Sequence, residues 1–268
     1  MKWLTESLVA LRAVDKACEL FETNPGIFNT WTKESSRDVV TDLDVRLEEA
    51  INSVLRHNGI PILSEETCFQ TNSEHAWIVD SLDGTLNFLN GIPFFAFSVG
   101  LRYQGKFVAG AVAFPALQEL YFTYGSEASF MNGRRLRPVA TQGTLFGAAF
   151  GTKINSEISN IGHDLFSVIN RDFQGCLRIG SAAALTCMVA KGSLQGAFGF
   201  GVKIWDVAAG LAVCKNAGYE IFTRSIANTQ CIDFFVGTPN SNTLLRNQYN
   251  SLVNIDQDSE WIKETLQS

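Results

Sequence analysis

Hydrophobic and polar residues in the first half of the chain follow first a helical and then a β pattern. Apolar residues recur every three or four positions in "LTESLVALRAVDKACELF", and charged residues between them interrupt any signal-peptide core, which predicts an amphipathic helix. The same spacing predicts a second helix over 42–57, with Thr41 as its N-cap. Alternating and continuous apolar runs then predict strands over 60–63, 77–79, 94–103, 106–114 and 118–124. An Asn-Gly hairpin turn is predicted at 131–134.

The pattern changes after about Gly143, where strands and helices alternate. Strands are predicted over 145–151, 176–179, 194–198, 219–223 and 232–236. Helices are predicted over 156–170, 182–190 and 205–216, and a last one within 242–266. This rhythm predicts an α/β half, 143–268, after an α+β half, 1–142. No linker-like segment separates the halves, so we expect them to pack tightly.

Composition narrows the class of protein. The 268 residues are 46% hydrophobic and 18% charged, enough for a large core. A net charge of −6 without a basic run argues against a nucleic-acid polymer as partner, and no apolar stretch is long enough to predict a membrane span. Six dispersed cysteines without a C-x-x-C pair, and three scattered histidines, argue against zinc and favour a reducing, cytoplasmic location.

Four acidic clusters carry the candidate chemistry. They are Asp38 and Asp44 in "DVVTDLD", Glu65 and Glu66 in "IPILSEE", Asp80 and Asp83 in "WIVDSLD", and Asp206 in "IWDVAAG". Each cluster alone is explained by a solvated surface. Together, several carboxylates at the ends of apolar segments form the ligand set that Mg²⁺ or Mn²⁺ prefers, and they would repel one another without a cation.

The stretch after Asp80 extends this hypothesis to phosphate chemistry. Asp80 and Asp83 can bridge and flank two metals, and the Leu82 carbonyl between them can be a further ligand. A helix that begins at Gly84 and Thr85 would present free amides to a phosphate, and the Thr85 hydroxyl could orient a water. The residues therefore predict metal-assisted phosphoryl transfer to water.

The strings "WIVDSLDGTLNF" and "WDVAAG" resemble the signatures of the inositol monophosphatase family, within the lithium-sensitive, Mg²⁺-dependent phosphatase superfamily. The softer motifs "DVVTDLD" and "SEE" also match, and matching positions extend from about Lys33 to Gly218. The resemblance implies a layered αβαβα sandwich, often dimeric, and a phosphomonoesterase acting on a small phosphorylated metabolite.

The resemblance also implies individual roles. Glu65, Asp80 and the Leu82 carbonyl would hold a first Mg²⁺. A second Mg²⁺ would be held by Asp80, Asp83 and Asp206, and a third, weaker one by Glu65. Mn²⁺ is a possible substitute for Mg²⁺. Asp44 would hydrogen-bond Thr85, and Glu65 and Thr85 would activate the water. The substrate side would comprise Asp83, Gly84, Thr85, Arg178, Ser181, Lys203 and Asp206, with Lys33 near the metals. Arg178 is equally explained by a structural role at the junction of the halves, and Lys33 by a solvated lysine.

Three departures from the family pattern concern Ser64, Ser81 and Gly199. The two serines replace a usual Gly and Pro and are mild changes. Gly199 stands where inositol phosphatases usually carry an acidic residue that contacts ring hydroxyls, so we expect it to influence substrate choice. Inositol 1-phosphate is the default substrate. The alternatives are 3′(2′),5′-bisphosphate nucleotidase or fructose-1,6-bisphosphatase-like activity and, more remotely, a non-catalytic phosphate-binding relative.

Overall fold

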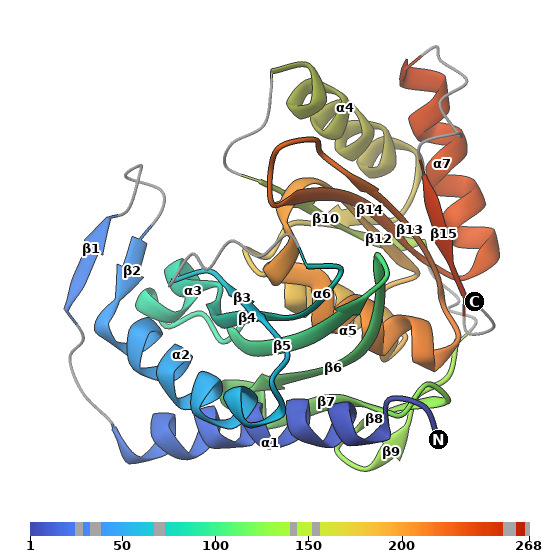
Figure 1. The fold of residues 1–268 in the computed structure, drawn as a ribbon. Coiled ribbons are helices and arrows are strands. Elements are labelled where there is room, and N and C mark those ends of the chain that lie inside the picture. Colours follow the sequence, from blue (N-terminus) through green and yellow to red (C-terminus); the bar gives the residue numbers. More distant parts are fainter. Residues whose placement is uncertain are drawn as a thin grey trace.

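Two mixed β-sheets alternate with layers of helices in the computed structural model (Figure 1), and residues 30–32 and 39–41 form a separate antiparallel pair of strands. The structure describes residues 1–24, 29–32, 39–66, 73–139, 144–151, 156–253 and 261–265, without the side chains of 156–159. Within these residues the order of layers is helix, sheet, helix, sheet, helix. The predicted αβαβα sandwich is therefore confirmed.

The first sheet is built from the first half of the chain. It has seven strands in the order β3-β4-β5-β6-β7-β8-β9, with β3 parallel to β4 and all later neighbours antiparallel. The elements of this half are α1 (Leu4–Thr23), β1 (Thr30–Thr32), β2 (Val39–Thr41), α2 (Asp42–Leu55), η1 (Arg56–Asn58), β3 (Ile62–Ser64), β4 (His75–Asp83), α3 (Thr85–Leu89), β5 (Ala96–Tyr103), β6 (Lys106–Phe114), η2 (Pro115–Leu117), β7 (Glu119–Tyr124), β8 (Ala128–Met131) and β9 (Arg134–Arg135).

The second sheet is built from the second half. Its six strands lie in the order β11-β10-β12-β14-β13-β15, in which β11, β10 and β12 are parallel and the remaining pairs antiparallel. The elements are β10 (Leu145–Phe150), α4 (Ser156–Asp172), β11 (Gly175–Leu177), α5 (Ala182–Ala190), β12 (Gly196–Lys203), α6 (Ile204–Ala217), β13 (Glu220–Ser225), β14 (Cys231–Gly237), α7 (Pro239–Val253) and β15 (Ile262–Glu264).

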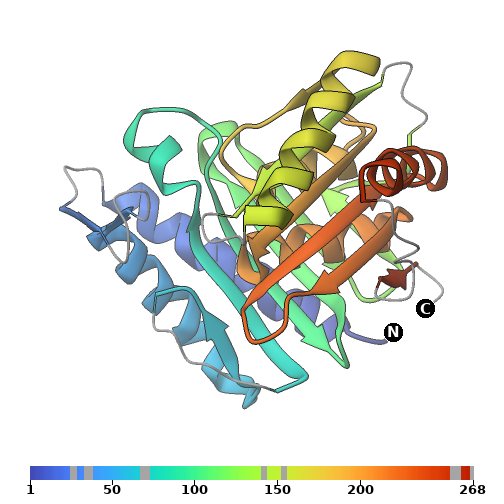
Figure 2. The same cartoon turned by 90° about the horizontal axis from the view of Figure 1, so that it is seen from above.

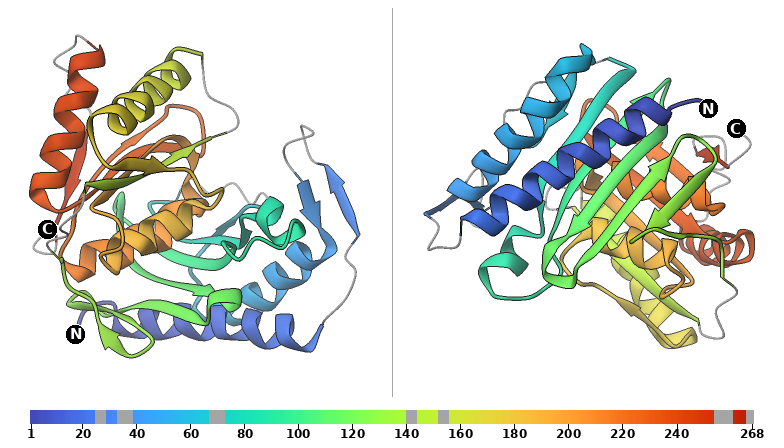
Figure 3. Two further views of the ribbon diagram at one scale, coloured as in Figure 1. Left: turned by 180° about the vertical axis from the view of Figure 1, so that it is seen from behind. Right: turned by 90° about the horizontal axis from the view of Figure 1, so that it is seen from below.

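The outer helices bury the apolar stripes that the sequence predicts. α1 and α2 lie side by side across the first sheet, as the view from below shows (Figure 3), and Val14 and Leu47 pack against Trp77 and Phe97 in one cluster. On the other side of the molecule α4 and α7 cover the second sheet (Figure 2), where its phenylalanines form a separate cluster. Each sheet is therefore covered on its outer face, which leaves its inner face for the middle layer.

The middle layer contains α5 and α6, between the two sheets (Figure 3, left). α6 is buried along nearly its whole length, which matches an apolar composition on all sides. It lies directly on the backbone of β5 and β6: a Cβ atom on Gly100 would be 2.8 Å from the Ala209 nitrogen, and one on Gly110 2.8 Å from the Ala209 Cα. This close approach fixes the start of α6 relative to the first sheet.

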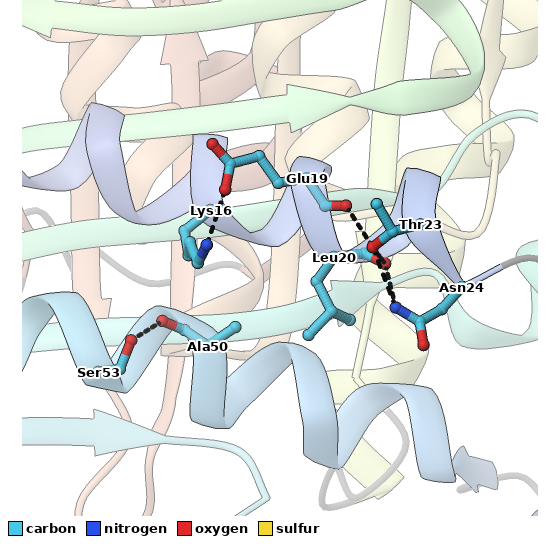
Figure 4. Close-up of polar contacts among 7 residues, drawn as sticks. All are labelled: Lys16, Glu19, Leu20, Thr23, Asn24, Ala50 and Ser53. Carbon is cyan, nitrogen blue, oxygen red and sulfur yellow. Dashed lines mark hydrogen bonds and ion pairs between the residues drawn. The ribbon is translucent and has the colours of Figure 1, made fainter.

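The C-terminal end of α1 is closed by its own side chains (Figure 4). The Thr23 hydroxyl donates to the carbonyl of Glu19 at 2.9 Å, and the Asn24 amide donates to the carbonyl of Leu20 at 2.8 Å. These bonds satisfy carbonyls that the last helical turn leaves without a partner. One turn earlier, Lys16 pairs with Glu19 at 2.7 Å on the exposed face.

The predicted elements are found in their predicted places, with three differences in extent. The strand predicted at 77–79 extends over 75–83, and the strand predicted at 194–198 extends to 203. Residues 262–264, expected inside a terminal helix, form the edge strand β15, because Glu264 is buried in an ion pair with Lys215 at 3.0 Å. The Asn-Gly hairpin is confirmed between β8 and β9, with both turn residues at positive φ.

Two sequence-based expectations have a more limited outcome. The predicted boundary between the halves, between residues 142 and 143, lies in the segment 140–143 outside the described residues, and the division into two domains stays a prediction. In the part of the chain that the structure describes, no helix has both the length and the apolar character needed to cross a bilayer.

The close packing of α6 leads to a stability prediction. We expect Gly110→Ala to lower the free energy of unfolding by about 2 kcal/mol or more, because the added methyl group meets helix backbone that cannot rotate away. The control is Gly105→Ala, at φ 74° with no atom within 4 Å of the added Cβ, which should cost only about 1 kcal/mol of backbone strain. Equal losses in thermal denaturation would show that α6 does not lie so close to β6.

Candidate metal centre

A pocket of about 200 Å³ opens where the two sheets and the middle layer meet. Its wall combines the end of β4, the start of α3, the end of β10 and the start of α6. Most of the predicted site residues line it, together with several that were not predicted: Val39, Glu65, Asp80, Leu82, Asp83, Gly84, Thr85, Leu86, Phe150, Gly151, Gly180, Lys203 and Asp206. Segments that are more than a hundred residues apart in sequence therefore share one cavity.

Three carboxylates converge in this pocket. Glu65 follows β3, Asp80 lies in β4, and Asp206 is the third residue of α6, and one carboxylate oxygen from each lies within 4.8 Å of the others. Burial, followed by the charges of Glu65, Asp83 and Asp206, raises the pKa of Asp80 well above its usual range. Burial and the charges of Asp83 and Glu65 do the same to the pKa of Asp206, against a smaller opposing effect of Lys203. This group of three carboxylates is therefore stabilised by binding protons or cations.

A bulge in β4 explains why Asp80 and Asp83 face the same side. Asp80 pairs with Ser98 and Asp83 with Ala96, so two residues of β4 stand opposite Phe97 alone. In a regular strand, residues three apart point to opposite faces. The extra residue cancels that inversion and turns both carboxylates toward the middle layer.

Asp83 lies beside the trio and is anchored to α5. Its Oδ2 atom accepts a short hydrogen bond from the Ser181 hydroxyl and another from the Ala183 amide at 2.9 Å. Ser181 is also the N-cap of α5, since its hydroxyl accepts the Ala184 amide at 3.0 Å. Burial raises the pKa of Asp83 to about 7, although these hydrogen bonds act in the opposite direction. Ser181 is not among the residues that line the pocket and is connected to it through Asp83.

Thr85 and Asp44 form a second hydrogen-bonded unit at the pocket. The Thr85 hydroxyl lies 3.2 Å from Asp44 Oδ1 and 3.0 Å from the carbonyl oxygen of Leu82, and its single hydrogen can serve only one acceptor at a time. Asp44 Oδ2 accepts the Thr41 amide at 2.8 Å and a short bond from the Thr41 hydroxyl, which makes the predicted N-cap a full capping box. Burial raises the pKa of Asp44.

Gly84 has the conformation that the turn between β4 and α3 requires. Its φ is 83°, and a Cβ atom at this position would lie 2.7 Å from the carbonyl oxygen of Phe94. Glycine adopts such a conformation without steric cost. The predicted helix after Asp83 is confirmed as the short α3, which begins at Thr85.

The remaining predicted residues have different positions. Lys203 lines the pocket, with Nζ 5.2 Å from the Trp205 ring centroid. Arg178 lies over the Phe150 ring at 5.4 Å and is not among the lining residues. Asp38 and Lys33 lie outside the described residues.

The structure corrects the expectation for Gly199. This residue pairs with Phe234 between β12 and β14, and a Cβ atom added to it would collide with the Phe234 ring. It is not among the residues that line the pocket. Gly199 therefore offers no side chain to the pocket, and one introduced there would first have to displace a fully buried aromatic ring.

The sequence reasoning missed Glu48 and the glycine-aromatic wall of the pocket. Glu48 is buried in α2 and accepts the Ser64 hydroxyl at 3.0 Å and the Glu66 amide at 2.9 Å, which holds the segment around Glu65 in place. A charged residue on the apolar face of a predicted helix was the available signal. Phe150 and Gly151 carried no comparable signal, because an apolar strand end is ordinary.

Comparisons with known proteins agree with this geometry. A model of the inositol monophosphatase family matches residues 5–245. An inositol-1-monophosphatase of Mesorhizobium japonicum is 38% identical over 188 residues, which cover 68% of this chain and 70% of the relative. A fructose-1,6-bisphosphatase/inositol-1-monophosphatase of Aquifex aeolicus is 33% identical over 197 residues, covering 69% of this chain and 72% of the relative.

A solved structure shows the same fold. The extragenic suppressor protein suhB of Bartonella henselae superposes with a TM-score of 0.75 at 28% identity, covering 90% of this chain and 96% of that one. Sequence motifs, fold and carboxylate geometry point in the same direction, and the chain belongs to the inositol monophosphatase family and is a phosphatase.

Proposed function

We propose that this phosphatase hydrolyses a small phosphorylated polyol or sugar, with inositol 1-phosphate as the default substrate and Mg²⁺ as cofactor. The observation that carries the proposal is the convergence of Glu65, Asp80 and Asp206 in one pocket beside Thr85, whose hydroxyl lies within hydrogen-bond distance of Asp44. Family membership implies dependence on a divalent metal. The substrate and the metal's identity are our inference.

The side chains present fit hard divalent cations. The donor set consists of carboxylate and carbonyl oxygens, and burial together with mutual repulsion raises the pKa values of Asp80 and Asp206, so cations beside them would stabilise their ionised forms. We assign Glu65, Asp80 and the Leu82 carbonyl to one Mg²⁺, Asp80, Asp83 and Asp206 to a second, and Glu65 to a weaker third. Mn²⁺ would suit the same ligands. Bound cations would lower the pKa of water and offset the charge of the phosphoryl group.

The protein's own groups would orient the attacking water. When the Thr85 hydroxyl donates to Asp44, its oxygen keeps lone pairs that can accept a hydrogen bond from the water. Glu65 would take the proton. The amides of Gly84 and Thr85 would hold phosphate oxygens, and Asp83, held by Ser181, would face the substrate with Asp206.

Lys203 is our candidate for contact with the part of the substrate beyond the phosphate. It lies in the pocket wall with Phe150 and Gly151, and Arg178 lies behind the Phe150 ring. A cation at this end suits hydroxyl groups or a second anionic group. The second case would correspond to a 3′(2′),5′-bisphosphate nucleotidase or a fructose-1,6-bisphosphatase-like activity, which we keep as alternatives.

Other properties follow from the family resemblance and remain part of the proposal. We expect a homodimer in the cytoplasm, inhibited by lithium, that acts on a small metabolite and has neither a nucleic-acid polymer nor a membrane as partner.

A phosphate-release screen with Mg²⁺ tests the function directly. Inositol phosphates, sugar phosphates and adenosine bisphosphates should be compared at equal concentration. We expect Asp206→Asn to reduce kcat/KM at least about a hundredfold, because loss of a ligand should exceed the 10- to 100-fold effect of an outer-shell change. Asp164→Asn, on the exposed surface of α4, is the matched control and should keep wild-type activity. No release from any substrate would favour a non-catalytic phosphate-binding protein.

A second prediction concerns the Thr85 hydroxyl. Thr85→Ala should lower kcat by about 10²- to 10⁴-fold, the range for a lost proton-handling group. Thr85→Ser keeps the hydroxyl within reach of Asp44 and should keep most of the activity. Similar losses in both variants would mean that the methyl group, and not the hydroxyl, matters at this position.

A third prediction follows from the raised pKa of Asp83. Its pKa is about 7 in the folded protein and about 3.9 in an unfolded chain, so its stabilising contribution is complete below pH 4 and is lost as the pH rises through 7. In metal-free buffer, Asp83→Asn should therefore gain in melting temperature relative to wild type, by roughly 5 °C, between pH 5 and pH 8.

Addition of Mg²⁺ provides the control for this pH effect. It should raise the melting temperature of the wild type more at pH 8 than at pH 5, because the cation binds the ionised cluster. Parallel pH curves for wild type and Asp83→Asn in metal-free buffer would contradict the raised pKa.

A further inference from the structure

β12 contains a one-residue bulge next to the pocket. Gly199 pairs with Phe234, but Val202 pairs with Ile232, so Phe200 and Gly201 together stand opposite Asp233. Gly201 has a φ of 59°, the left-handed conformation typical of a bulge that contains glycine. The irregularity is thus built into the sequence and pairing of this strand.

The bulge reverses the side-chain alternation just before α6. Phe198 and Phe200 belong to the outer cluster of the second sheet, and regular alternation would place Val202 there as well. Val202 instead packs in the cluster of the middle layer. The direction of Lys203, the next residue and part of the pocket wall, is therefore set by the extra residue.

Asp233 holds this bulge from the opposite strand. Its Oδ1 atom accepts the Gly201 amide at 2.8 Å, and its Oδ2 atom accepts both Nε and Nη2 of Arg224, at 3.1 and 2.7 Å. Asp233 is fully buried, and the Arg224 guanidinium lies 4.8 Å from the Trp261 ring centroid. A buried side chain thus accepts a hydrogen bond from a backbone amide at the point where the bulge disrupts the regular ladder.

The other edge of the bulge supports a second part of the pocket wall. The Gly151 amide donates to the Phe200 carbonyl at 3.1 Å, and a Cβ atom on Gly151 would collide with the Gly201 carbonyl. Gly151 and Lys203 both line the pocket. The bulge of β12 is therefore in contact with two neighbouring pieces of the wall.

We propose that Asp233, paired with Arg224, is a positioning residue that clamps the β12 bulge and so aims Lys203 at the substrate. The proposal rests on the proposed function, since it assigns Lys203 to the substrate side. A buried ion pair contributes little net stability compared with an apolar replacement, so the local geometry is what this pair adds. The backbone of α6 is held by its packing on β5 and β6, so we expect Asp206 to keep its place, although its carboxylate also hydrogen-bonds the backbone of Lys203.

Two double variants separate the clamp from the ion pair. Arg224→Gln/Asp233→Asn removes both charges but keeps a side-chain oxygen that can accept the Gly201 amide. Arg224→Leu/Asp233→Ala removes both charges and the acceptor. Both double variants lose the ion pair. Their melting temperatures show whether the two variants are equally stable, as a fair comparison requires.

The kinetic readout is the separate measurement of KM and kcat with the best substrate of the phosphate-release screen. The Leu/Ala variant should raise KM at least about tenfold, equivalent to about 1.4 kcal/mol of binding, with kcat within about threefold of wild type. The Gln/Asn variant should keep KM within about threefold. Equal increases of KM in both variants, or no increase in either, would overturn the proposal.

Amide hydrogen exchange provides a readout that does not need activity. Peptides covering residues 200–204 should exchange faster in the Leu/Ala variant and at the wild-type rate in the Gln/Asn variant. Equal exchange in the two variants would overturn the clamp even if the wild type proved inactive. An inactive wild type with the expected difference in exchange would overturn only the proposed function and, with it, the role of Lys203.

Discussion

Repulsion between neighbouring carboxylates is the constraint on which this site depends. Glu65, Asp80 and Asp206 bring oxygens within 4.8 Å of one another, and Asp83 is buried beside them. Such a cluster cannot assemble by mutual attraction, so the scaffold must hold each member separately. β4 carries Asp80 and Asp83, while the contact of α6 with bare backbone in the first sheet holds Asp206. Divalent cations then stabilise an arrangement of carboxylates that the sheets and α6 already hold in place.

Two bulges adapt this regular frame to chemistry. In β4 the extra residue turns Asp80 and Asp83 to one face, and in β12 it reverses the alternation before Lys203. Both strands lie next to the middle layer, so the two irregularities meet at the same pocket. Side chains then stabilise the result: Ser181 anchors Asp83, and Asp233 holds Gly201. The layers thus supply rigidity, and small departures from regular pairing aim the functional groups.

Sequence patterns predicted most elements because helix and strand periodicities are local. The acidic clusters were also recognisable, since carboxylates at the ends of apolar segments need a reason to be there. β15 was missed because its pairing partner β13 is distant in sequence, as is Lys215, which lies 49 positions before Glu264 and forms a buried contact with it. Gly199 was expected to influence substrate choice because the sequence does not show which residues surround it. In the structure, the Phe234 ring fills the space beside it. Glu48 escaped notice because its partners lie on another segment.

By itself, the sequence determined most helices and strands, the N-cap at Thr41 and the acidic residues that could serve as ligands, because these depend on residue type and short-range spacing. The family resemblance implied which carboxylates meet, but the contacts themselves are made only by the tertiary structure. It joined Glu65 to Asp80 and Asp206, tied Asp83 to Ser181, and put Thr85 within reach of Asp44. The physical reason is that register, bulges and interlayer packing are long-range properties. A shift of one residue in pairing changes the face on which a side chain lies, and a list of residue types does not record that shift.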